Sequence, residues 1–330
     1  MKMRRLCLIL LGFTLVGCNG EGTKPDPLKV GIDTFVGFAP VFLARDLPIF
    51  NDLGVEVEPQ IIMDTTERTS ALAGGKIDAL CTTADSLLLT ASNGVDLVIV
   101  AAVDVSAGAD GIIARKEIGS VRDLAGKTVA FQEAMPSHFF LLSLLQREGL
   151  KASDILGVHM NADEAGAAFI AGKVDAAVTW EPWLSRAHQE GKGNILASTA
   201  DHPGVLVDVL AVRRDVLQRR EREVAALYLG WMRAIDRWKG DRAESERLMS
   251  TRLGLPLEEF QRNVTTVRFA DKAFNEAFFR RGEKASIWDL AENAVATWKG
   301  AGIIKPTSTF NPGSHISARI VELGSKAESK

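Results

Sequence analysis

The chain has 330 residues, 46% of them hydrophobic and 25% charged, so it can bury a core large enough for about two domains. Its formal net charge is -3, and removing the three positive charges of an N-terminal leader that has no acidic residue leaves -6. This acidic balance argues against a nucleic-acid partner.

The leader is typical of an export signal. MKMRR is basic, and the apolar stretch LCLILLGFTLVG that follows is too short to span a bilayer as a helix. Its end, LVGC at positions 15–18, resembles the bacterial lipobox, in which the cysteine is acylated. We therefore expect a lipoprotein signal peptide over 1–17, lipidation of Cys18 and a Gly/Pro-rich tether over 18–27. A plain signal peptide with an incidental cysteine is the alternative.

Cysteine usage agrees with this interpretation. If Cys7 is removed with the leader and Cys18 is acylated, only Cys81 is left, and no intrachain disulfide can form. Cys81 has no CxxC partner, so we expect a buried thiol at the end of a strand.

The segment from 28 to 83 alternates strand and helix patterns. Apolar runs rich in strand formers flank two helical stretches, and Pro40 falls in the first turn of the first helix, where proline is tolerated. The pattern predicts strands at 28–35, 55–63 and 76–83 and helices at 38–50 and 65–75.

The same order returns about a hundred residues later. GKIDAL and GKVDAA place Asp78 and Asp175 at an offset of 97, and the pattern again predicts three strands and two helices, at 127–135, 155–160 and 174–180 and at 137–150 and 164–173. A chance recurrence of the glycine turn is the alternative. Two βαβαβ units predict two lobes, each a mainly parallel sheet covered by helices on both faces.

Two further segments have the strand character needed to join such lobes. The segment 108–118 is expected to cross from the first lobe to the second and 202–217 to cross back, so that two hinges form. From Arg214 onward the chain is mainly helical, with Leu227, Trp231, Ile235 and Trp238 on one apolar stripe that reads as core. We expect lobe 1 to comprise 28–109 and 208–330 and lobe 2 to comprise 110–207.

A ligand is expected between the lobes, because the carboxyl ends of parallel strands and the helix N-termini beside them form the binding crevice of such sheets. The strand ends that carry hydroxyl, carboxylate or aromatic groups are 32–38, 81–86, 103–110, 131–138 and 179–183. A helix cap is the alternative role for each polar residue here, above all for Thr82, Thr83 and Ser137.

Several of these motifs resemble one family. The lipobox, GFAPVFLARD, GADGIIA and above all GKVDAAVTWEPWLSRA resemble the solute-binding proteins of bacterial ABC importers for nitrate, sulfonates and taurine, which share a fold with thiamine-precursor pyrimidine-binding proteins. The resemblance covers about 28–217. It implies an α/β type II periplasmic binding protein, exported to the cell envelope and monomeric, whose two lobes close on one small molecule and present it to a membrane permease and its ATPase.

The candidate ligand-binding residues come from this resemblance and from the strand ends. The resemblance supplies Thr34, Phe35, Gly37, Phe38, Thr82, Thr83, Ser106, Ser137, Trp180 and Glu181. The strand ends add His138 and the acids Asp85, Asp110, Glu133 and Asp208.

The charge of these segments predicts the chemistry of the ligand. They supply several carboxylates but hardly any Lys or Arg, which favours a cationic or zwitterionic ligand. Glu181, beside Trp180 at a strand end, is the best candidate to pair with a ligand cation. Glu133 would oppose an anion, and so disfavours taurine and alkylsulfonates.

No catalytic set stands out in the sequence. The five histidines have no metal-ligand spacing, and the HExxH, GxSxG, GxGxxG and P-loop motifs are missing. We therefore expect a binding protein without catalytic residues, metal or cofactor. A pyrimidine-synthase-like enzyme on the same fold, with His138 as its chemical group, and a ligand sensor or adhesin without a transport role are the alternatives.

Overall fold

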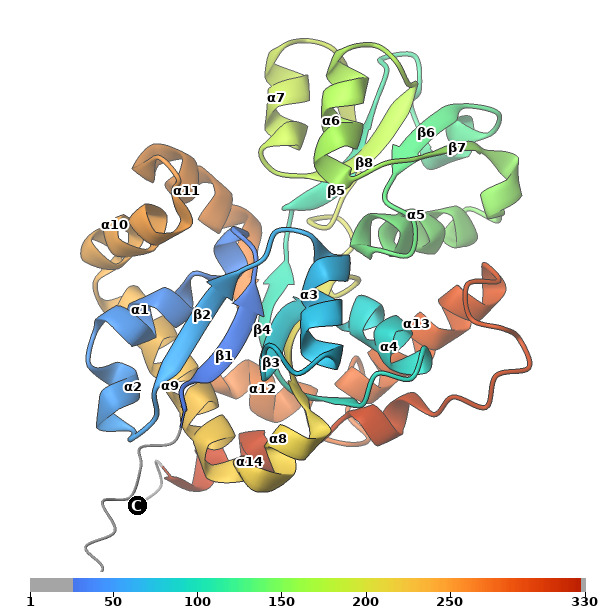
Figure 1. Cartoon of the computed structure of the whole chain (residues 1–330). Helices are drawn as coiled ribbons and strands as arrows, with labels where there is room; N and C mark the ends of the chain where they lie inside the picture. The colour runs from blue at the N-terminus through green and yellow to red at the C-terminus, as the bar shows by residue number, and fades with distance from the viewer. Residues whose placement is uncertain (1–25, 328–330) are drawn as a thin grey trace, which may run out of the picture.

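The computed structural model describes residues 26–327, which form two lobes joined by short crossing segments (Figure 1). The larger lobe 1 lies below and the smaller lobe 2 above it, to the right, in this view. The predicted signal peptide, the lipidation site Cys18 and most of the tether lie outside the described residues. No helix within 26–327 has the length and apolar character needed to cross a membrane.

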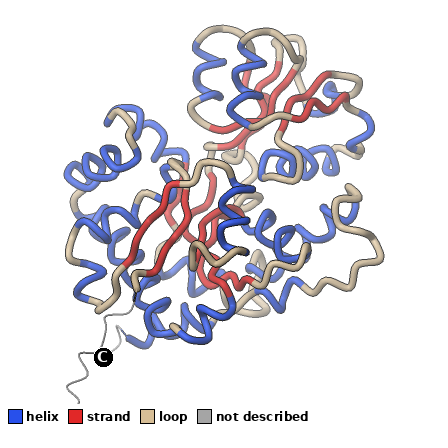
Figure 2. Tube along the Cα trace, viewed as in Figure 1, coloured by secondary structure: helices blue, strands red, loops and turns tan. Residues whose placement is uncertain are grey.

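Lobe 1 is built on a six-stranded sheet. Its strand order is β11 (Val267–Phe269), β4 (Leu97–Ser106), β10 (Val207–Arg213), β3 (Ala79–Thr83), β1 (Leu28–Ile32) and β2 (Val57–Ile61). Every residue of β3 and β4 is buried, because helices cover both faces of the sheet (Figure 2).

The helices of lobe 1 come from both ends of the chain. The first half contributes η1 (Val36–Phe38), α1 (Pro40–Asp46), α2 (Ile49–Asp52), α3 (Thr65–Ala73) and α4 (Ala84–Ser92). The C-terminal tail contributes α8 (Arg214–Arg219), α9 (Glu221–Gly240), α10 (Arg242–Leu253), α11 (Leu257–Asn263), η4 (Val264–Thr266), α12 (Lys272–Phe278), α13 (Ile287–Gly300), η5 (Pro312–His315) and α14 (Arg319–Ala327).

The apolar stripe predicted in the tail belongs to α9. Leu227, Trp231 and Ile235 are fully buried, and Trp238 is half-buried at the end of the stripe. These side chains join the core of lobe 1, as their spacing of three and four residues requires for one helix face.

Lobe 2 repeats the plan on a smaller scale. Its sheet has the order β7 (Leu156–His159), β6 (Thr128–Phe131), β8 (Ala176–Trp180), β5 (Asp110–Ala114) and β9 (Asn194–Ser198). It is flanked by η2 (Val121–Leu124), α5 (Pro136–Arg147), η3 (Ala152–Asp154), α6 (Ala162–Ile170) and α7 (Trp183–Gln189).

Both sheets contain parallel and antiparallel strand pairs, whereas the sequence predicted mainly parallel sheets. The three strands of each βαβαβ unit pair in parallel, β2 with β1 and β1 with β3 in lobe 1, and β7 with β6 and β6 with β8 in lobe 2. The strands next to the crossings pair antiparallel: β10 with β3 and β4, and β5 with β8 and β9. A strand that enters from the other lobe runs against its neighbours, which adds these antiparallel pairs.

The repeated Gly-Lys-apolar-Asp-Ala motif has the same structural role in both lobes. Asp78 accepts a hydrogen bond from the backbone N–H of Lys29 at 3.0 Å, and Asp175 accepts one from that of Thr128 at 2.9 Å. In each case the Asp backbone N–H bonds back to the same strand residue. Each motif therefore joins the third strand of its unit to the first, so the recurrence reflects a repeated fold unit.

The lobes are linked where the chain leaves one sheet for the other, at 107–109 and at 199–206. These segments overlap the starts of the predicted crossings 108–118 and 202–217, whose later residues are paired within β5 and β10. The Oγ1 atom of the buried Thr199 accepts a hydrogen bond from the N–H of Gly108 at 2.8 Å and lies 2.7 Å from Oγ of Ser106. The two crossings are thus bonded to each other.

Candidate functional site

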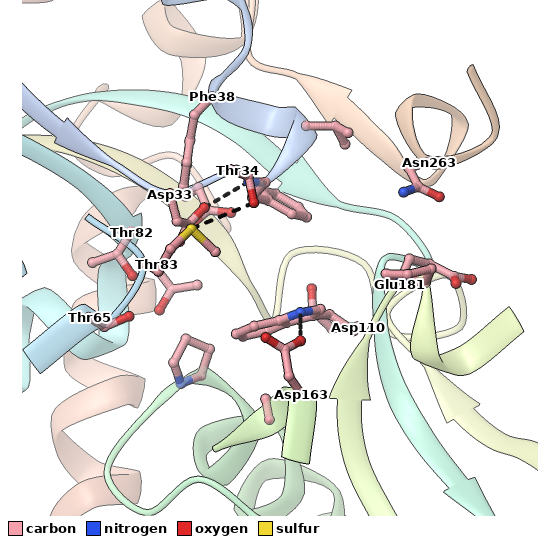
Figure 3. Close-up of a pocket in the computed structure, with 18 of the residues that line it drawn as sticks. Asp33, Thr34, Phe38, Thr65, Thr82, Thr83, Asp110, Asp163, Glu181 and Asn263 are labelled. Atoms are coloured by element: carbon pink, nitrogen blue, oxygen red, sulfur yellow. Dashed lines mark hydrogen bonds between the residues drawn. The ribbon is translucent and has the colours of Figure 1, made fainter. Parts of the chain in front are cut away.

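A cavity of about 320 Å³ lies between the two lobes (Figure 3). Its walls come from the carboxyl ends of β1 and β3 in lobe 1, from β8 and the start of β5 in lobe 2, and from the first residues of α3, α5 and α6. A cavity bounded by strand ends and helix starts of two sheets is the position in which this kind of fold binds small molecules.

Nine of the fifteen candidate residues line this cavity. Phe35, Phe38 and Trp180 provide aromatic surface, and the others provide hydroxyl or carboxylate oxygens; the full set is Thr34, Phe35, Phe38, Thr82, Thr83, Asp110, Trp180, Glu181 and Asp208. In Figure 3 the labelled lobe 1 residues Thr34, Phe38, Thr82 and Thr83 lie across the cavity from Asp110 and Glu181.

The loop after β1 is held by an ion pair between the half-buried Asp33 and the buried Arg68. Asp33 accepts a hydrogen bond from the N–H of Phe35 at 2.8 Å and lies 3.0 Å from Nη2 of Arg68. Arg68 is only 1% exposed and also donates to the carbonyl of Ile62 and the hydroxyl of Thr65. Because every one of these groups is fixed by another, the loop that carries Thr34 to Phe38 is preorganised.

The lobe 2 wall is organised around Trp180 and Glu181. The indole N–H of Trp180 donates to Asp163 at 2.9 Å, and that of Trp183 donates to the same oxygen at 2.8 Å. Both carboxylate oxygens of Glu181 accept hydrogen bonds from Ser185, one from its N–H and one from its hydroxyl. Glu181 therefore lines the cavity while it holds the first turn of α7, so it is less free to meet a ligand than its position in the sequence predicts.

Two carboxyl groups lie side by side at the lobe 1 wall. Asp208 on β10 is paired in register with both Thr83 on β3 and Asp104 on β4, and it is 6% exposed where it lines the cavity. Asp104 is completely buried and lies against Gly37, where an added Cβ would come within 2.0 Å of its Oδ2 atom. Gly37 is thus the residue that leaves room for Asp104.

Asp110 occupies the junction between the cavity and the first crossing. Its Oδ2 accepts a hydrogen bond from the hydroxyl of Ser106 at 2.6 Å. Burial raises the pKa of Asp110 to about 6, and the neighbouring Asp33 adds to the rise while the Ser106 bond opposes it.

The six other candidates do not line the cavity. Gly37 and Ser106 support it from behind, through Asp104 and Asp110 respectively. Asp85 is 1% exposed inside α4, where it accepts a hydrogen bond from Ser86; the remaining three, Glu133, Ser137 and His138, lie at the start of α5.

In the loop before α5, the residue that faces the cavity is Gln132, and not its neighbour Glu133 as expected. Glu133 is exposed and lies 3.0 Å from Nδ1 of His159, while its neighbour Gln132 lines the cavity. Because Glu133 does not face the cavity, it cannot oppose an anionic ligand there, and that argument against taurine and alkylsulfonates no longer holds. Ser137 is engaged locally, with its Oγ accepting from the N–H of Gln132.

His138 is packed as a neutral ring. Its Nδ1 accepts a hydrogen bond from the N–H of Ala134, and the ring stacks on Phe131 with centroids 4.6 Å apart. Burial lowers the pKa of His138 to about 4, so the ring carries no charge near neutral pH. With no access to the cavity, this histidine has a packing role.

Several lining residues were not anticipated. Asn161 and Asp163 follow β7 at the start of α6, and the strand-end rule that selected the other segments would have found them. Leu255, Glu259, Asn263 and Thr266 come from the helical tail, which folds over the cavity. Nothing in the local sequence of the tail signals this contact, because it depends on tertiary packing.

The cavity is acidic. Its described lining includes seven carboxylates and no Lys, Arg or His side chain; the carboxylates are Asp33, Asp64, Asp110, Asp163, Glu181, Asp208 and Glu259. Within 26–327 no group of His, Cys, Asp or Glu side chains has the arrangement of a metal site. The arrangement can therefore enclose and hydrogen-bond a small molecule, and it favours positive charge on it.

Comparison with known proteins places the chain by sequence and by fold. Residues 21–254 match the model of the NMT1-like family. A protein of Escherichia coli (strain K12), named as a candidate aliphatic sulfonates-binding protein, is 35% identical over 40% of this chain and 42% of its own length. The taurine-binding periplasmic protein of the same organism is 25% identical over 47% of this chain and 49% of its own length. The chain thus matches about half of each of these two relatives.

The fold has solved counterparts. The alkanesulfonate-binding protein SsuA from Xanthomonas axonopodis pv. citri, bound to MOPS, superimposes with a TM-score of 0.71 at 22% identity, covering 89% of this chain and 99% of that one. This likeness confirms the predicted two-lobed α/β fold of the periplasmic binding proteins.

Proposed function

Because the chain belongs to the NMT1-like family, we propose that it is the solute-binding subunit of an ABC importer. The observation that carries this proposal is the cavity between the lobes, to which both sheets contribute their strand ends. Two lobes that share one ligand can close on it by rotation about the crossings. The names of the sulfonate- and taurine-binding relatives point to the same role.

The solute is a small polar organic compound that contains nitrogen or sulfur. A cavity of about 320 Å³ accommodates only a small molecule, and three aromatic side chains among oxygen-rich neighbours suit one that has both an apolar and a polar part. The site residues of this proposal are the nine candidates that line the cavity, together with Asp33, Gln132, Asn161 and Asn263.

The proposed subunit is exported and held at a membrane surface by acyl chains on Cys18, with the signal peptide 1–17 removed. It works as a monomer that delivers its solute to a permease driven by an ATPase. The start of the described chain is compatible with a tether: the carbonyl of Asp26, its first residue, accepts a hydrogen bond from Arg220. The strand β1 that follows begins at the end of lobe 1 remote from lobe 2 (Figure 1).

Small-angle scattering tests the binding and closure together. The protein is unfolded and refolded to remove any solute retained during purification, and a thermal-shift panel of sulfonates, nitrate, amines and heterocycles then identifies a binder. We expect a smaller radius of gyration at saturation with that binder than without it. An unchanged radius would contradict closure of the lobes, and a panel without any binder would contradict solute binding.

The enzyme alternative depends on His138. His138, the one histidine with a chemical role in that alternative, does not line the cavity and is uncharged. A sensor or adhesin differs from an importer subunit in its partner. Co-purification of the anchored protein with a permease and an ATPase would favour import, and its absence in a detergent extract that keeps the lipid anchor would favour sensing.

A further inference from the structure

Asp208 differs from the other carboxylates that line the cavity. Asp33 pairs with Arg68, Asp64 caps α3, Asp110 accepts from Ser106, and Glu259 lies 3.9 Å from Arg186; Asp163 and Glu181 are engaged as described above. Asp208 alone accepts no hydrogen bond from a donor group and forms no ion pair within 26–327, although it is 94% buried. A polar group buried without a donor is costly unless something else satisfies it.

Asp104 lies beside Asp208 and also lacks a hydrogen-bond donor within 26–327. Neither of its carboxylate oxygens is contacted by an N–H or O–H donor in the described chain. The register of β10 and β4 places the two carboxyl groups side by side on one face of the sheet. Two carboxylates in this arrangement can bond to each other only through a proton that they share, because each is an acceptor when ionised.

The charged surroundings reinforce this sharing. Burial, and then the negative charges around them, raise the pKa values of Asp104 and Asp208 well above their ordinary range. The groups that face the pair are Asp33 after β1, Asp110 at the start of β5 and Asp85 in α4, with Cys81 on β3 as a buried thiol. Arg68 is the nearby cation, and it is paired with Asp33.

We propose that Asp208, backed by Asp104, is the subsite for a cationic nitrogen group of the solute, an ammonium or an amidinium, and that the carboxyl pair releases its shared proton to solvent as the cation enters. The inference rests on the proposed solute-binding function and specifies the charge of the solute. The cation takes the place of the proton between the carboxyl groups and the cavity, so the net charge of the pair together with the group that it holds is the same before and after binding.

The rest of the cavity fits a cation better than an anion. A sulfonate or nitrate would face seven carboxyl groups with no cationic side chain among the described lining residues. Phe35, Phe38 and Trp180 offer ring faces, which attract a cation by their quadrupoles. A zwitterion such as taurine can also bind if its ammonium group takes the subsite and its anionic group stays near the helix N-termini.

Matched pairs of compounds test the charge requirement. Refolded, solute-free protein is titrated with taurine and with ethanesulfonate, which lacks only the amine, and with ethanolamine, choline, acetamidine and nitrate. We expect at least one ammonium or amidinium compound to raise the melting temperature, and ethanesulfonate and nitrate to leave it unchanged.

Variants locate the subsite. For the best binder we expect Asp208→Asn to weaken the affinity by at least 30-fold, because the cation would lose its charged partner in a dry site. Glu133→Gln is the matched control: it removes the same charge from an exposed position outside the cavity, and we expect unchanged affinity. The melting temperature of each variant without ligand verifies that it is folded.

Calorimetry tests the proton release. At pH 7 the binding enthalpy should differ between phosphate and Tris buffers by an amount that corresponds to roughly one proton released per ligand. In Asp104→Asn, where no acidic proton can be shared, we expect binding to persist and this difference to shrink.

The outcomes separate the inference from the function on which it rests. Binding of ethanesulfonate or nitrate alone would overturn the cationic subsite and leave solute binding intact. A best binder whose affinity is the same in Asp208→Asn, or whose enthalpy is independent of the buffer, would overturn the inference as well. A panel in which no compound of either charge binds would overturn both.

Discussion

Replacing Asp85 by Asn should stabilise the protein, and only above acidic pH. Asp85 lies in the first turn of α4 and is 1% exposed, and its carboxylate accepts a hydrogen bond from the hydroxyl of Ser86. Burial raises its pKa from 3.8 to about 7, against the opposing effect of hydrogen bonds from Thr83 and Ser86. The folded state therefore keeps a proton on Asp85 at a pH where the unfolded state has lost it.

The sign and size of the effect follow from this difference. Between pH 4 and 7 the native state binds one more proton at Asp85 than the unfolded state does, so wild-type stability falls as the pH rises through this range. Each pH unit is worth about 1.4 kcal/mol, so the loss attributable to Asp85 reaches about 4 kcal/mol near pH 7 and then levels off. Asn keeps the size of the side chain and its acceptor oxygen, and carries no charge to desolvate.

Denaturant unfolding between pH 4.5 and pH 8 measures this difference. We expect Asp85→Asn to be close to wild type at the acidic end and more stable by about 4 kcal/mol at pH 8. The control is Asp52→Asn, an exposed carboxylate in α2, which should change stability little at any pH. A variant that is equally stable relative to wild type at every pH, or less stable at pH 8, would refute the reasoning.

Three further predictions follow from the site and the leader. Cys18→Ala, expressed with its leader, should remain uncleaved and lose partitioning into detergent; partitioning that persists would remove the lipoprotein proposal. Gly37→Ala should destabilise the protein by about 1 to 3 kcal/mol, measured by chemical unfolding, because its Cβ would clash with Asp104, and normal stability would show that the loop after β1 can move away. Glu181→Gln should cost about 0.5 to 2 kcal/mol of stability through its bonds to Ser185 and leave solute affinity within a few-fold, whereas a large loss of affinity in calorimetry would return Glu181 to the role of cation partner.

The sequence was sufficient to predict the fold because its pattern is local. Helices ended by glycine recur at matching places. Gly75 and Gly172, which follow the second helix of each unit, have φ values of 70° and 72°, and Gly149, which follows the first helix of the second unit, has 74°. Glycine adopts this conformation without strain. The third strand of each unit, β3 and β8, is a mainly apolar run that is buried almost throughout, as a strand covered on both faces requires. The resemblance to one family then fixed how the two units combine.

Within the site, the sequence predicted strand ends better than side-chain directions. Thr82, Thr83 and Asp208 line the cavity as expected. Gln132 and Glu133 are adjacent, and adjacent side chains near a strand end point in different directions, so a choice between them could not be made from the sequence. The prediction took the charged residue, while the structure directs Gln132 into the cavity and pairs Glu133 with His159.

Contacts between segments that are far apart in the chain could not be predicted from local sequence patterns. Asp104 sits in the middle of an apolar strand pattern, and its partner Asp208 is 104 residues away; only the pairing of β4 with β10 reveals that the two meet. The same holds for Asn263 in the tail, whose position over the cavity depends on how α10 and α11 pack against lobe 1.

The hydrogen bonds at Thr199 bear on how the lobes move. Gly108 of one crossing, and Ser106 at the end of β4 just before it, are bonded to Thr199 of the other crossing, so the two connections lie next to each other. Rotation about a line through both preserves these bonds, whereas twisting one lobe about its long axis would pull Gly108 away from Thr199. We therefore expect the lobes to open and close by rotation about one axis through the two crossings. Solutes of different length would then give different opening angles about the same axis.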